Sequence, residues 1–349
     1  MLARAKGGFR LILNYFSFAI SASIFGPFLL KEKKPDIIFV FEPSPVTVGL
    51  PAVILGHIKN VPIVFWALDL WPETLSAVGV IHSQRIINLV GHLVRFIYTR
   101  CTLVLGQSKG FLNSISKYCD KKEKVRYFPS WAEDIFTTEK TKLAPEVVFQ
   151  PDIFNIMFAG NIGESQDMPA VLEAASFLRE NKHIRWLIVG DGRKFDWLQK
   201  EIKNRNLTDT IILLGRFPVD RMPSFYAHAD ALLVCLKKGP AFSMTIPGKL
   251  QSYLFSGTPV LAMLDGEGAA IVEEAKAGLA CPAGDSRSLA ENVLKMTIMP
   301  KEELKIFGSN GRAYAQKEFG RNQLMQKMEN LLKEAIQLFH IENKSKSNI

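Results

Sequence analysis

The sequence has little that points to disulfide, metal or nucleic-acid chemistry. Its four cysteines are scattered and none forms a C-x-x-C pair, so a reducing cytosol is the simplest compartment. The six histidines show no metal-ligand spacing, and we therefore expect no metal site. There is no arginine-rich tract and no zinc-finger spacing, which argues against a nucleic-acid partner.

The length and the charge balance are more informative, because they bear on the number of domains and on the partner. A chain of 349 residues is too long for one comfortable hydrophobic core, so we expect two domains. The formal net charge of +9 is uneven, because residues 1–150 hold 18 Lys and Arg against 11 Asp and Glu. A basic first half suggests that one domain faces an anionic surface, and membrane phosphate headgroups are the partner we favour.

A long uncharged run covers residues 11–30, between Arg10 and Lys31. Its length could cross a bilayer, but Asn14, three serines and Pro27 dilute its apolar character. Three interpretations stay open: a helix that covers a sheet face and touches the membrane surface, which we favour, a fully buried helix, and a true membrane span.

Short apolar runs alternate with longer amphipathic segments along most of the chain. Such runs predict strands buried on both faces, and the segments between them predict crossover helices of a parallel sheet. In the first half we expect strands at 36–41, 62–67, 102–106 and 125–128. In the second half we expect strands at 154–159, 185–189, 210–214, 231–235, 259–262 and 279–281.

This pattern predicts the α/β fold class, with two tandem Rossmann-like, doubly wound parallel-sheet domains and a ligand cleft between them. The first domain opens with a helix and lacks an opening strand and glycine-bearing turn. We therefore expect it to be incomplete, as though its first one or two βα units were missing. The predicted divisions are an N-terminal domain over 1–140, a linker over 141–152, a second Rossmann-like domain over 153–320, a C-terminal helix over 321–340 and a disordered tail over 341–349.

A candidate anion site begins at Gly248 and Lys249. The stretch Thr245–Ala262 has the pattern of a polar turn, a helix, a glycine stop and a buried strand. Gly248 lets the backbone approach a ligand, and Lys249 adds an ammonium beside the free N–H groups of the helix N-terminus. This combination favours an anion, and a diphosphate fits. The alternative is an ordinary loop-helix-strand unit with a solvated lysine.

The turn after the first strand of the second half is a second candidate. Gly160 and Gly163 lie between that strand and the next helix, where glycines allow a phosphate to approach the backbone. Asn161 and Gln166 are the polar side chains that could line the site. Both could instead be ordinary turn and helix-cap residues.

Other strand ends supply charged candidates. Arg193 and Arg216 follow the next two strands, and parallel strands bring their carboxyl ends to one edge, where ligands of such folds bind. Glu267 and Gly268 follow the strand at 259–262, and Glu267 could accept hydrogen bonds from sugar hydroxyls or could cap a helix. In the first half, Asp69 is the best-placed carboxylate for contact with an acceptor hydroxyl.

These residues, in this order, resemble the family 4 glycosyltransferases, which are retaining enzymes of the two-Rossmann GT-B architecture. The resemblance is strongest to transferases of bacterial O-antigen, capsule and colanic-acid assembly, notably the L-fucosamine transferases. The segments that carry it are DLWPE at 69–73, KVRYFPSWAED at 124–134, FAGNIG at 158–163, IVGDGR at 188–193, LLGRFP at 213–218, IPGKLQSYLFSGTPVLAM at 246–263 and GLACPAGD at 278–285.

The resemblance implies a UDP-sugar donor, with N-acetyl-L-fucosamine as one donor sugar, and a lipid-diphosphate-linked sugar acceptor at the first domain. It implies no metal or other cofactor, because basic residues and helix N-termini hold the diphosphate in such enzymes. It also implies a cytoplasmic enzyme, peripheral at the inner membrane. Gln251 and Ser252, within the IPGKLQSYL segment, are expected to contact the donor.

The sequence departs from the family pattern at several places. The family's pair of glutamates, eight residues apart, is replaced by Met244 and Ser252, and its Gly-Arg…Lys pair is replaced at Asn161 and Gln166. The opening strand and its glycine-rich loop are missing as well. Two alternatives therefore stay open: a truncated, inactive paralogue that binds membrane or nucleotide, and a sugar-nucleotide 2-epimerase of the same architecture.

Overall fold

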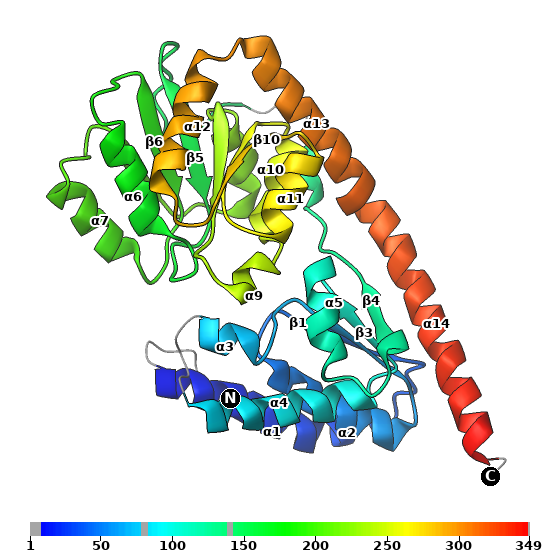
Figure 1. The fold of residues 1–349 in the computed structure, drawn as a ribbon. Helices are drawn as coiled ribbons and strands as arrows, with labels where there is room; N and C mark the ends of the chain where they lie inside the picture. The colour runs from blue at the N-terminus through cyan, green and yellow to red at the C-terminus, as the bar shows by residue number, and fades with distance from the viewer. Residues whose placement is uncertain (1–7, 78–82, 138–141, 348–349) are drawn as a thin grey trace. The chain divides into compact units, whose positions relative to one another are not determined.

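The computed structural model describes residues 8–77, 83–137 and 142–347, and the chain forms two compact units (Figure 1). Unit 1 consists of Met1–Pro129 together with Asn322–Ile349, and unit 2 consists of Ser130–Arg321. The domain boundary predicted at residue 140 falls on 138–141, outside the described residues.

Unit 1 contains a four-stranded parallel sheet in the order β1-β2-β3-β4. All five residues of β2 are buried, as the apolar run predicted for a strand covered on both faces. The elements of unit 1 are α1 (Gly8–Leu29), β1 (Ile38–Glu42), η1 (Val46–Val48), α2 (Gly49–Lys59), β2 (Ile63–Ala67), α3 (Glu73–Ala77), α4 (Gln84–Arg100), β3 (Leu103–Gly106), α5 (Lys109–Ser116), η2 (Lys122–Lys124), β4 (Val125–Tyr127) and α14 (Arg321–Ser347).

Unit 2 contains a six-stranded parallel sheet in the order β10-β9-β8-β5-β6-β7. Its strands and first helices are β5 (Phe154–Ala159), α6 (Met168–Phe177), β6 (Ile184–Val189), α7 (Phe195–Asn204), β7 (Ile211–Gly215), β8 (Ala231–Cys235), β9 (Val260–Met263) and β10 (Gly278–Cys281). Its other helical elements are η3 (Asp134–Thr137), η4 (Val219–Arg221), α8 (Met222–Tyr226), α9 (Pro240–Ser243), α10 (Gly248–Ser256), α11 (Glu267–Glu274), α12 (Ser286–Ile298) and α13 (Lys301–Phe319).

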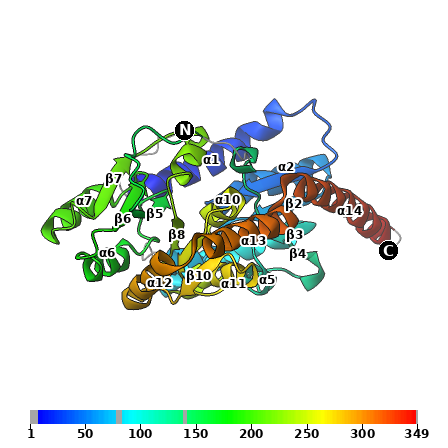
Figure 2. The same ribbon diagram turned by 90° about the horizontal axis from the view of Figure 1, so that it is seen from above.

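The strand order of unit 2 reverses between β5 and β8, so the sheet is wound in both directions. Helices α6, α7 and α12 cover one face of the sheet, and α10, α11 and α13 cover the other (Figure 1). Figure 2 shows α13 lying along α10. The predicted fold class, two doubly wound α/β units with parallel sheets, is confirmed. In such a sheet, the carboxyl ends of the strands at the reversal point form the edge where ligands bind.

Helix α1 packs beside α2 in unit 1 (Figure 1). It buries Ala19, but its last turns expose large apolar side chains: Phe25 is 60% exposed, Phe28 74% and Leu29 81%. The interpretation as a fully buried helix is therefore wrong. Within the described part of the chain, no helix has the length and apolar character needed to span a bilayer.

Helix α14 continues to Ser347, so the disordered tail predicted from residue 341 is wrong as far as residue 347; residues 348–349 lie outside the described ones. An apolar stripe explains most of its packing, because side chains three to four residues apart share one face. Its buried members are Leu324, Met328, Leu331 and Ala335.

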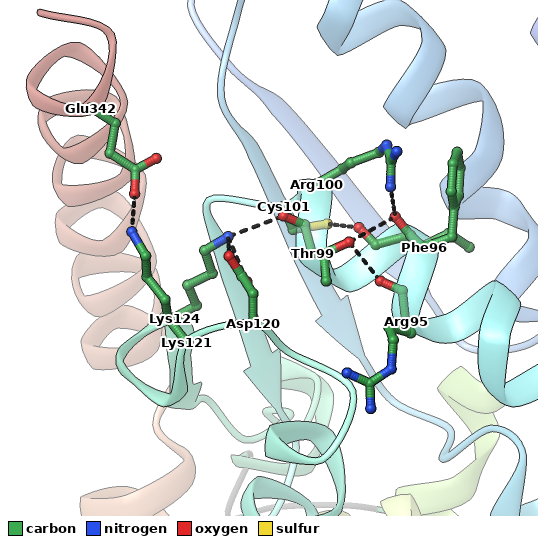
Figure 3. Close-up of polar contacts among 10 residues, drawn as sticks. Arg95, Phe96, Thr99, Arg100, Cys101, Asp120, Lys121, Lys124 and Glu342 are labelled. Atoms are coloured by element: carbon green, nitrogen blue, oxygen red, sulfur yellow. Dashed lines mark hydrogen bonds and ion pairs between the residues drawn. The ribbon is translucent and has the colours of Figure 1, made fainter. Parts of the chain in front are cut away.

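Ion pairs join α14 to the segment around β4, within unit 1. Arg126 lies 2.6 Å from Glu334, and Lys121 lies 2.9 Å from Glu342 (Figure 3). These pairs are largely exposed, so each contributes about 0–1 kcal/mol. Next to them, the Lys124 ammonium donates to the main-chain oxygen of Thr99, at the end of α4 (Figure 3). A cation there is favoured by the helix dipole.

Glu42, the last residue of β1, is the most unusual acidic side chain of unit 1. It is fully buried, and neither of its carboxyl oxygens has a well-formed hydrogen bond among the described residues; the N–H groups of Asp69 and Leu68 lie near enough only to lower its pKa in part. Burial is the main cause that raises its pKa well above the ordinary 4.5, and the nearby charge of Asp69 raises it further. Glu42 is therefore held as a neutral acid inside the core.

The raised pKa of Glu42 predicts a stability cost that grows with pH. Above pH 4.5 the unfolded chain releases this proton while the folded chain keeps it, so the stability contributed by Glu42 falls by about 1.4 kcal/mol per pH unit until its folded pKa is reached. We expect Glu42→Gln to be more stable than the wild type at neutral pH, by a margin that shrinks towards pH 4.5. Urea unfolding across this pH range measures the margin. A margin that does not change with pH would contradict a neutral Glu42.

Candidate functional site

The carboxyl ends of three neighbouring strands of unit 2 meet at glycines. The N–H of Gly160, after β5, donates to the oxygen of Val189 at 2.9 Å, and the N–H of Gly190, after β6, donates to the oxygen of Gly215 at 2.7 Å. Two turns therefore follow the strands side by side. They form a main-chain surface at the edge where the fold places ligands.

The two turns are packed so closely that side chains are excluded between them. A Cβ on Gly190 would lie 1.9 Å from the main-chain oxygen of Gly160, and a Cβ on Gly192 would lie 2.3 Å from that of Ile162. Gly190 also has a φ of +144°, which other residues rarely adopt. These glycines thus keep the space between the two turns free of side chains.

A cavity of about 440 Å³ opens at this edge. Gly160 and Asn161 form one part of its wall, the β6 turn forms another, and Arg216, Phe217 and Met222 complete it. The cavity thus combines a cation, main-chain groups and two large apolar side chains. That mixture suits a ligand with a charged part and a flat apolar part.

Lys249 lies in the first turn of α10, directly against the Gly160 turn. A Cβ on Gly160 would lie 3.1 Å from the Lys249 Nζ. The Lys249 Nζ also lies 3.5 Å from the centre of the Phe158 ring. The Nζ is buried and has no hydrogen-bond partner among the described residues. An ammonium in such a place lacks the counter-charge that its burial calls for.

Burial lowers the pKa of Lys249 from 10.5 to about 8. Cys235 is the titratable side chain coupled to it, and burial raises the pKa of that thiol to about 11, so the thiol stays neutral near neutral pH. The pKa of Lys249 is therefore low enough that a neighbouring anion, by raising it, would keep the side chain charged at mildly basic pH.

Three of the predicted contact residues are engaged in local hydrogen bonds. The Gln166 side chain accepts from the N–H of Gly163 at 3.1 Å, which is the turn role left open by the sequence. Ser252 donates to the main-chain oxygen of Lys249 at 2.8 Å. The buried Gln251 amide, with its nitrogen facing the main chain, donates to the oxygen of Gly248 at 2.7 Å. These bonds shape the turns around Lys249.

The described residues that line the cavity do not include Arg193, Glu267, Gly268 or Asp69. Arg193 is exposed on the β6 turn. Glu267 is the first residue of α11, and Gly268 lets that helix pack closely, since a Cβ there would lie 3.2 Å from Pro247. Asp69 belongs to unit 1, where it accepts from the Trp71 indole at 3.1 Å.

The sequence reasoning missed Tyr253 and Phe158. Tyr253 lies four residues after Lys249, on the same face of α10, and its hydroxyl bonds to both main-chain groups of Ala159. The i, i+4 spacing from Lys249 is the signal that could have identified Tyr253. Phe158 precedes the Gly160 turn and forms the aromatic wall against the ammonium.

No cluster of three or more His, Cys, Asp or Glu side chains that could hold a metal ion is present in the described parts of the chain. The charged groups at this edge are the cations Lys249 and Arg216 and the carboxylate of Asp191, which accepts from the N–H of Gly192 at 2.7 Å. The site is therefore suited to a phosphorylated ligand held by cations and main-chain N–H groups.

Comparison with known proteins bears on this same region. Residues 153–297 match the family model described as "Glycosyl transferases group 1". An Escherichia coli K12 protein, provisionally named as the colanic acid biosynthesis glycosyl transferase WcaI, is 29% identical over 158 residues, which are 43% of this chain and 37% of that protein. The N-acetyl-alpha-D-glucosaminyl L-malate synthase of Bacillus anthracis is 19% identical over 74% of this chain and 68% of its own length. The family match and the relatives support a glycosyl transferase.

Solved structures show the fold. HepE of Anabaena, solved in complex with UDP and glucose, superposes with a TM-score of 0.69 at 15% identity, covering 95% of this chain and 84% of its own. Sucrose-phosphate synthase of Thermosynechococcus elongatus gives a TM-score of 0.71 at 15% identity, covering 96% and 80%. The two units thus form the GT-B fold.

The pKa of Lys249 predicts how affinity for a diphosphate depends on pH. Below about pH 8 the ammonium is already charged, so affinity should be nearly constant; above it, binding must take up a proton and weakens about tenfold per pH unit. We expect UDP titrated calorimetrically to show proton uptake that grows as the pH rises through 8 and vanishes about two pH units below it. Affinity that stays constant far above pH 8 would show that this ammonium does not meet the phosphates.

Proposed function

We propose that this protein is a retaining glycosyltransferase that moves a sugar from a UDP-sugar to an acceptor hydroxyl. The observation that carries the proposal is the buried Lys249 ammonium, which has no partner in the described residues and lies against the glycine turn that borders the cavity. A diphosphate supplies the missing counter-charge. The match to group 1 glycosyl transferases over the same segment supports it.

The chemistry follows from where charge develops. When the bond from the sugar to the diphosphate breaks, negative charge grows on the leaving UDP. Lys249 and Arg216 stabilise that charge, together with the N–H groups of the first turn of α10. These groups are fixed by the fold before the substrate arrives, so little reorganisation is needed during the reaction.

The cavity wall suits the nucleoside. Phe217 and Met222 provide apolar surface, and Phe217 is held in place by Phe225, with ring centroids 4.5 Å apart. A uracil ring against these side chains leaves the diphosphate directed towards the Gly160 turn. The complex of the Anabaena protein HepE with UDP supports this choice of nucleotide.

The sugar and the acceptor are assigned to the remaining candidates. Glu267, at the start of α11, orients donor hydroxyls together with the main chain of Gly268. Asp69 of unit 1 holds the acceptor hydroxyl that attacks. The donor to test first is UDP-N-acetyl-L-fucosamine, as implied by the resemblance to transferases of bacterial surface polysaccharides, and a relative named for colanic acid biosynthesis is consistent with that class.

The acceptor we propose is a lipid-diphosphate-linked sugar at the cytoplasmic face of the inner membrane. Helix α1 exposes apolar side chains, and the loop after it exposes Lys31, Lys33 and Lys34. The Lys59 ammonium holds this loop by donating to the main-chain oxygens of Lys31 and Lys33, at 2.7 and 2.9 Å. An apolar helix bordered by lysines complements an anionic lipid surface.

Replacing the buried ammonium tests the diphosphate site. Lys249→Met keeps the length of the side chain and removes its charge. We expect the melting temperature without ligand to stay the same or rise at neutral pH, because a depressed lysine pKa costs stability below about pH 8. UDP affinity should fall by about tenfold or more. Lys200→Met, on the exposed face of α7, is the matched control and should change neither. Unchanged UDP affinity in Lys249→Met would refute the site.

A donor panel tests the reaction itself. The full chain is incubated with UDP-sugars and a lipid-diphosphate-linked acceptor, and the product is analysed for the configuration at the transferred anomeric carbon. Transfer with retained configuration is the expected outcome. An inverted product would rule out the retaining mechanism. Release of an epimerised UDP-sugar without acceptor would instead identify a 2-epimerase.

Vesicle binding tests the membrane surface. Replacing Lys31, Lys33 and Lys34 together by Gln should weaken binding to phosphatidylglycerol vesicles roughly a hundredfold, since each lysine near an anionic surface contributes about 1 kcal/mol. Phe28→Ser should weaken it further, whereas Ile298→Ser, at an equally exposed apolar position of unit 2, is the control. Binding that is equal for all variants, or insensitive to salt, would exclude this surface.

A further inference from the structure

The hydroxyl of Tyr253 makes a pair of hydrogen bonds that joins α10 to the end of β5. It accepts from the N–H of Ala159 at 2.9 Å and donates to the oxygen of the same residue at 3.1 Å. The Tyr253 side chain is fully buried. Tyr226 contacts the ring edge to face, with centroids 5.4 Å apart, so the ring has little freedom to move.

The Tyr253 hydroxyl lies beside the end of β5, where β5 has no pairing with β8. Alternate residues of a parallel strand bond to alternate neighbours: Gly160 donates towards β6, and Asn155 accepts from Asp230, just before β8. The main-chain N–H and oxygen of Ala159 point towards the β8 side of β5, as those of Asn155 do. However, β5 pairs with β8 only over Ile156 and Met157, so β8 does not reach Ala159. Tyr253 therefore satisfies the two main-chain groups of Ala159 that β8 leaves unpaired.

The position of Ala159 gives this bond a consequence for the site. Ala159 immediately precedes Gly160, whose turn borders the cavity and lies against the Lys249 ammonium. Lys249 and Tyr253 are one helical turn apart on α10. One helix thus supplies the cation and also fixes the main chain that faces it.

We propose that Tyr253 is a positioning residue of the diphosphate site: its hydroxyl replaces the missing strand partner of Ala159 and fixes the Gly160 turn at the distance from Lys249 that a diphosphate requires. This inference rests on the proposed function, because it assigns the diphosphate of a nucleotide to that turn. Tyr253 does not itself touch the ligand. It acts through the main chain of residues 159 and 160.

Removing the hydroxyl should loosen the turn without emptying the core. Tyr253→Phe keeps the ring and its contact with Tyr226, but it leaves the N–H and the oxygen of Ala159 buried and unpaired. Such groups seek other partners, so the turn departs from its position. Ordering the turn again when UDP binds then lowers affinity, by about tenfold for the loss of this pair of bonds.

The experiment compares Tyr253→Phe with Tyr226→Phe, which makes the same chemical change in the neighbouring ring. Hydrogen exchange of the peptide that covers residues 158–163 is measured without nucleotide, and UDP affinity is measured by calorimetry. We expect faster exchange in this peptide and about tenfold weaker UDP binding for Tyr253→Phe. Tyr226→Phe, which removes a hydroxyl that hydrogen-bonds Ser252 and not Ala159, should change both much less than Tyr253→Phe does. With donor and acceptor, KM for the UDP-sugar should rise more than kcat falls.

Two results would overturn the inference. Exchange in residues 158–163 that is unchanged in Tyr253→Phe would show that the hydroxyl does not hold the turn. Faster exchange with unchanged UDP affinity and KM would show that holding the turn does not serve the ligand. A wild-type protein that binds no UDP would instead refute the proposed function, and the exchange measurement would still decide whether Tyr253 fixes the turn.

Discussion

The candidate site of unit 2 depends on an ammonium placed where it has no counter-charge. Lys249 lies against the Phe158 ring and beneath the Gly160 turn, and its Nζ has no hydrogen-bond partner among the described residues. A charge in such surroundings is costly for the free protein. The arrangement is understandable if the counter-charge arrives with a ligand, because the cost already present in the free protein then becomes binding energy.

The surroundings of that ammonium follow from the same constraint. Glycines at 160 and 190 let two turns approach each other without side chains, which leaves main-chain groups directed at the edge of the sheet. Arg216 adds a second cation on the far side of the cavity. Glu42 in unit 1 presents the opposite case, an acid buried without a well-formed hydrogen bond among the described residues, which avoids the cost of charge by keeping its proton.

The sequence predicted the fold well, because continuous apolar runs that alternate with amphipathic segments are a strong signal of a parallel α/β sheet. Runs such as DIIFVF and PIVFWA both became strands, but of these two only β2 is buried on both faces; β1 exposes Phe39 and Phe41, so its predicted burial on both faces is wrong. Helix α14 was predicted too short, because residues after Phe339 are mostly polar and carry no helical periodicity. Tertiary contacts such as the pair between Lys121 and Glu342 support the helix there, and local propensity cannot show them.

The site was predicted in part. Gly160, Asn161 and Arg216 line one cavity, and Lys249 lies against Gly160, because parallel strands bring their carboxyl ends together whatever the details of the turns. Gln166, Gln251 and Ser252 were chosen as ligand contacts, but their side chains are engaged by the turns themselves. Whether a side chain hydrogen-bonds a given main-chain atom depends on where the pairing between two strands ends. The register of the strands in the folded sheet determines that end, and the sequence does not show it.

The path of the chain has a consequence for how the protein can be divided. Unit 2 is one continuous stretch, Ser130–Arg321, whereas unit 1 joins the first part of the chain to Asn322–Ile349. Topologically, unit 2 is an insertion into unit 1. It can be excised whole by two cuts, while unit 1 can be made alone only by fusing residues 129 and 322 across a designed linker.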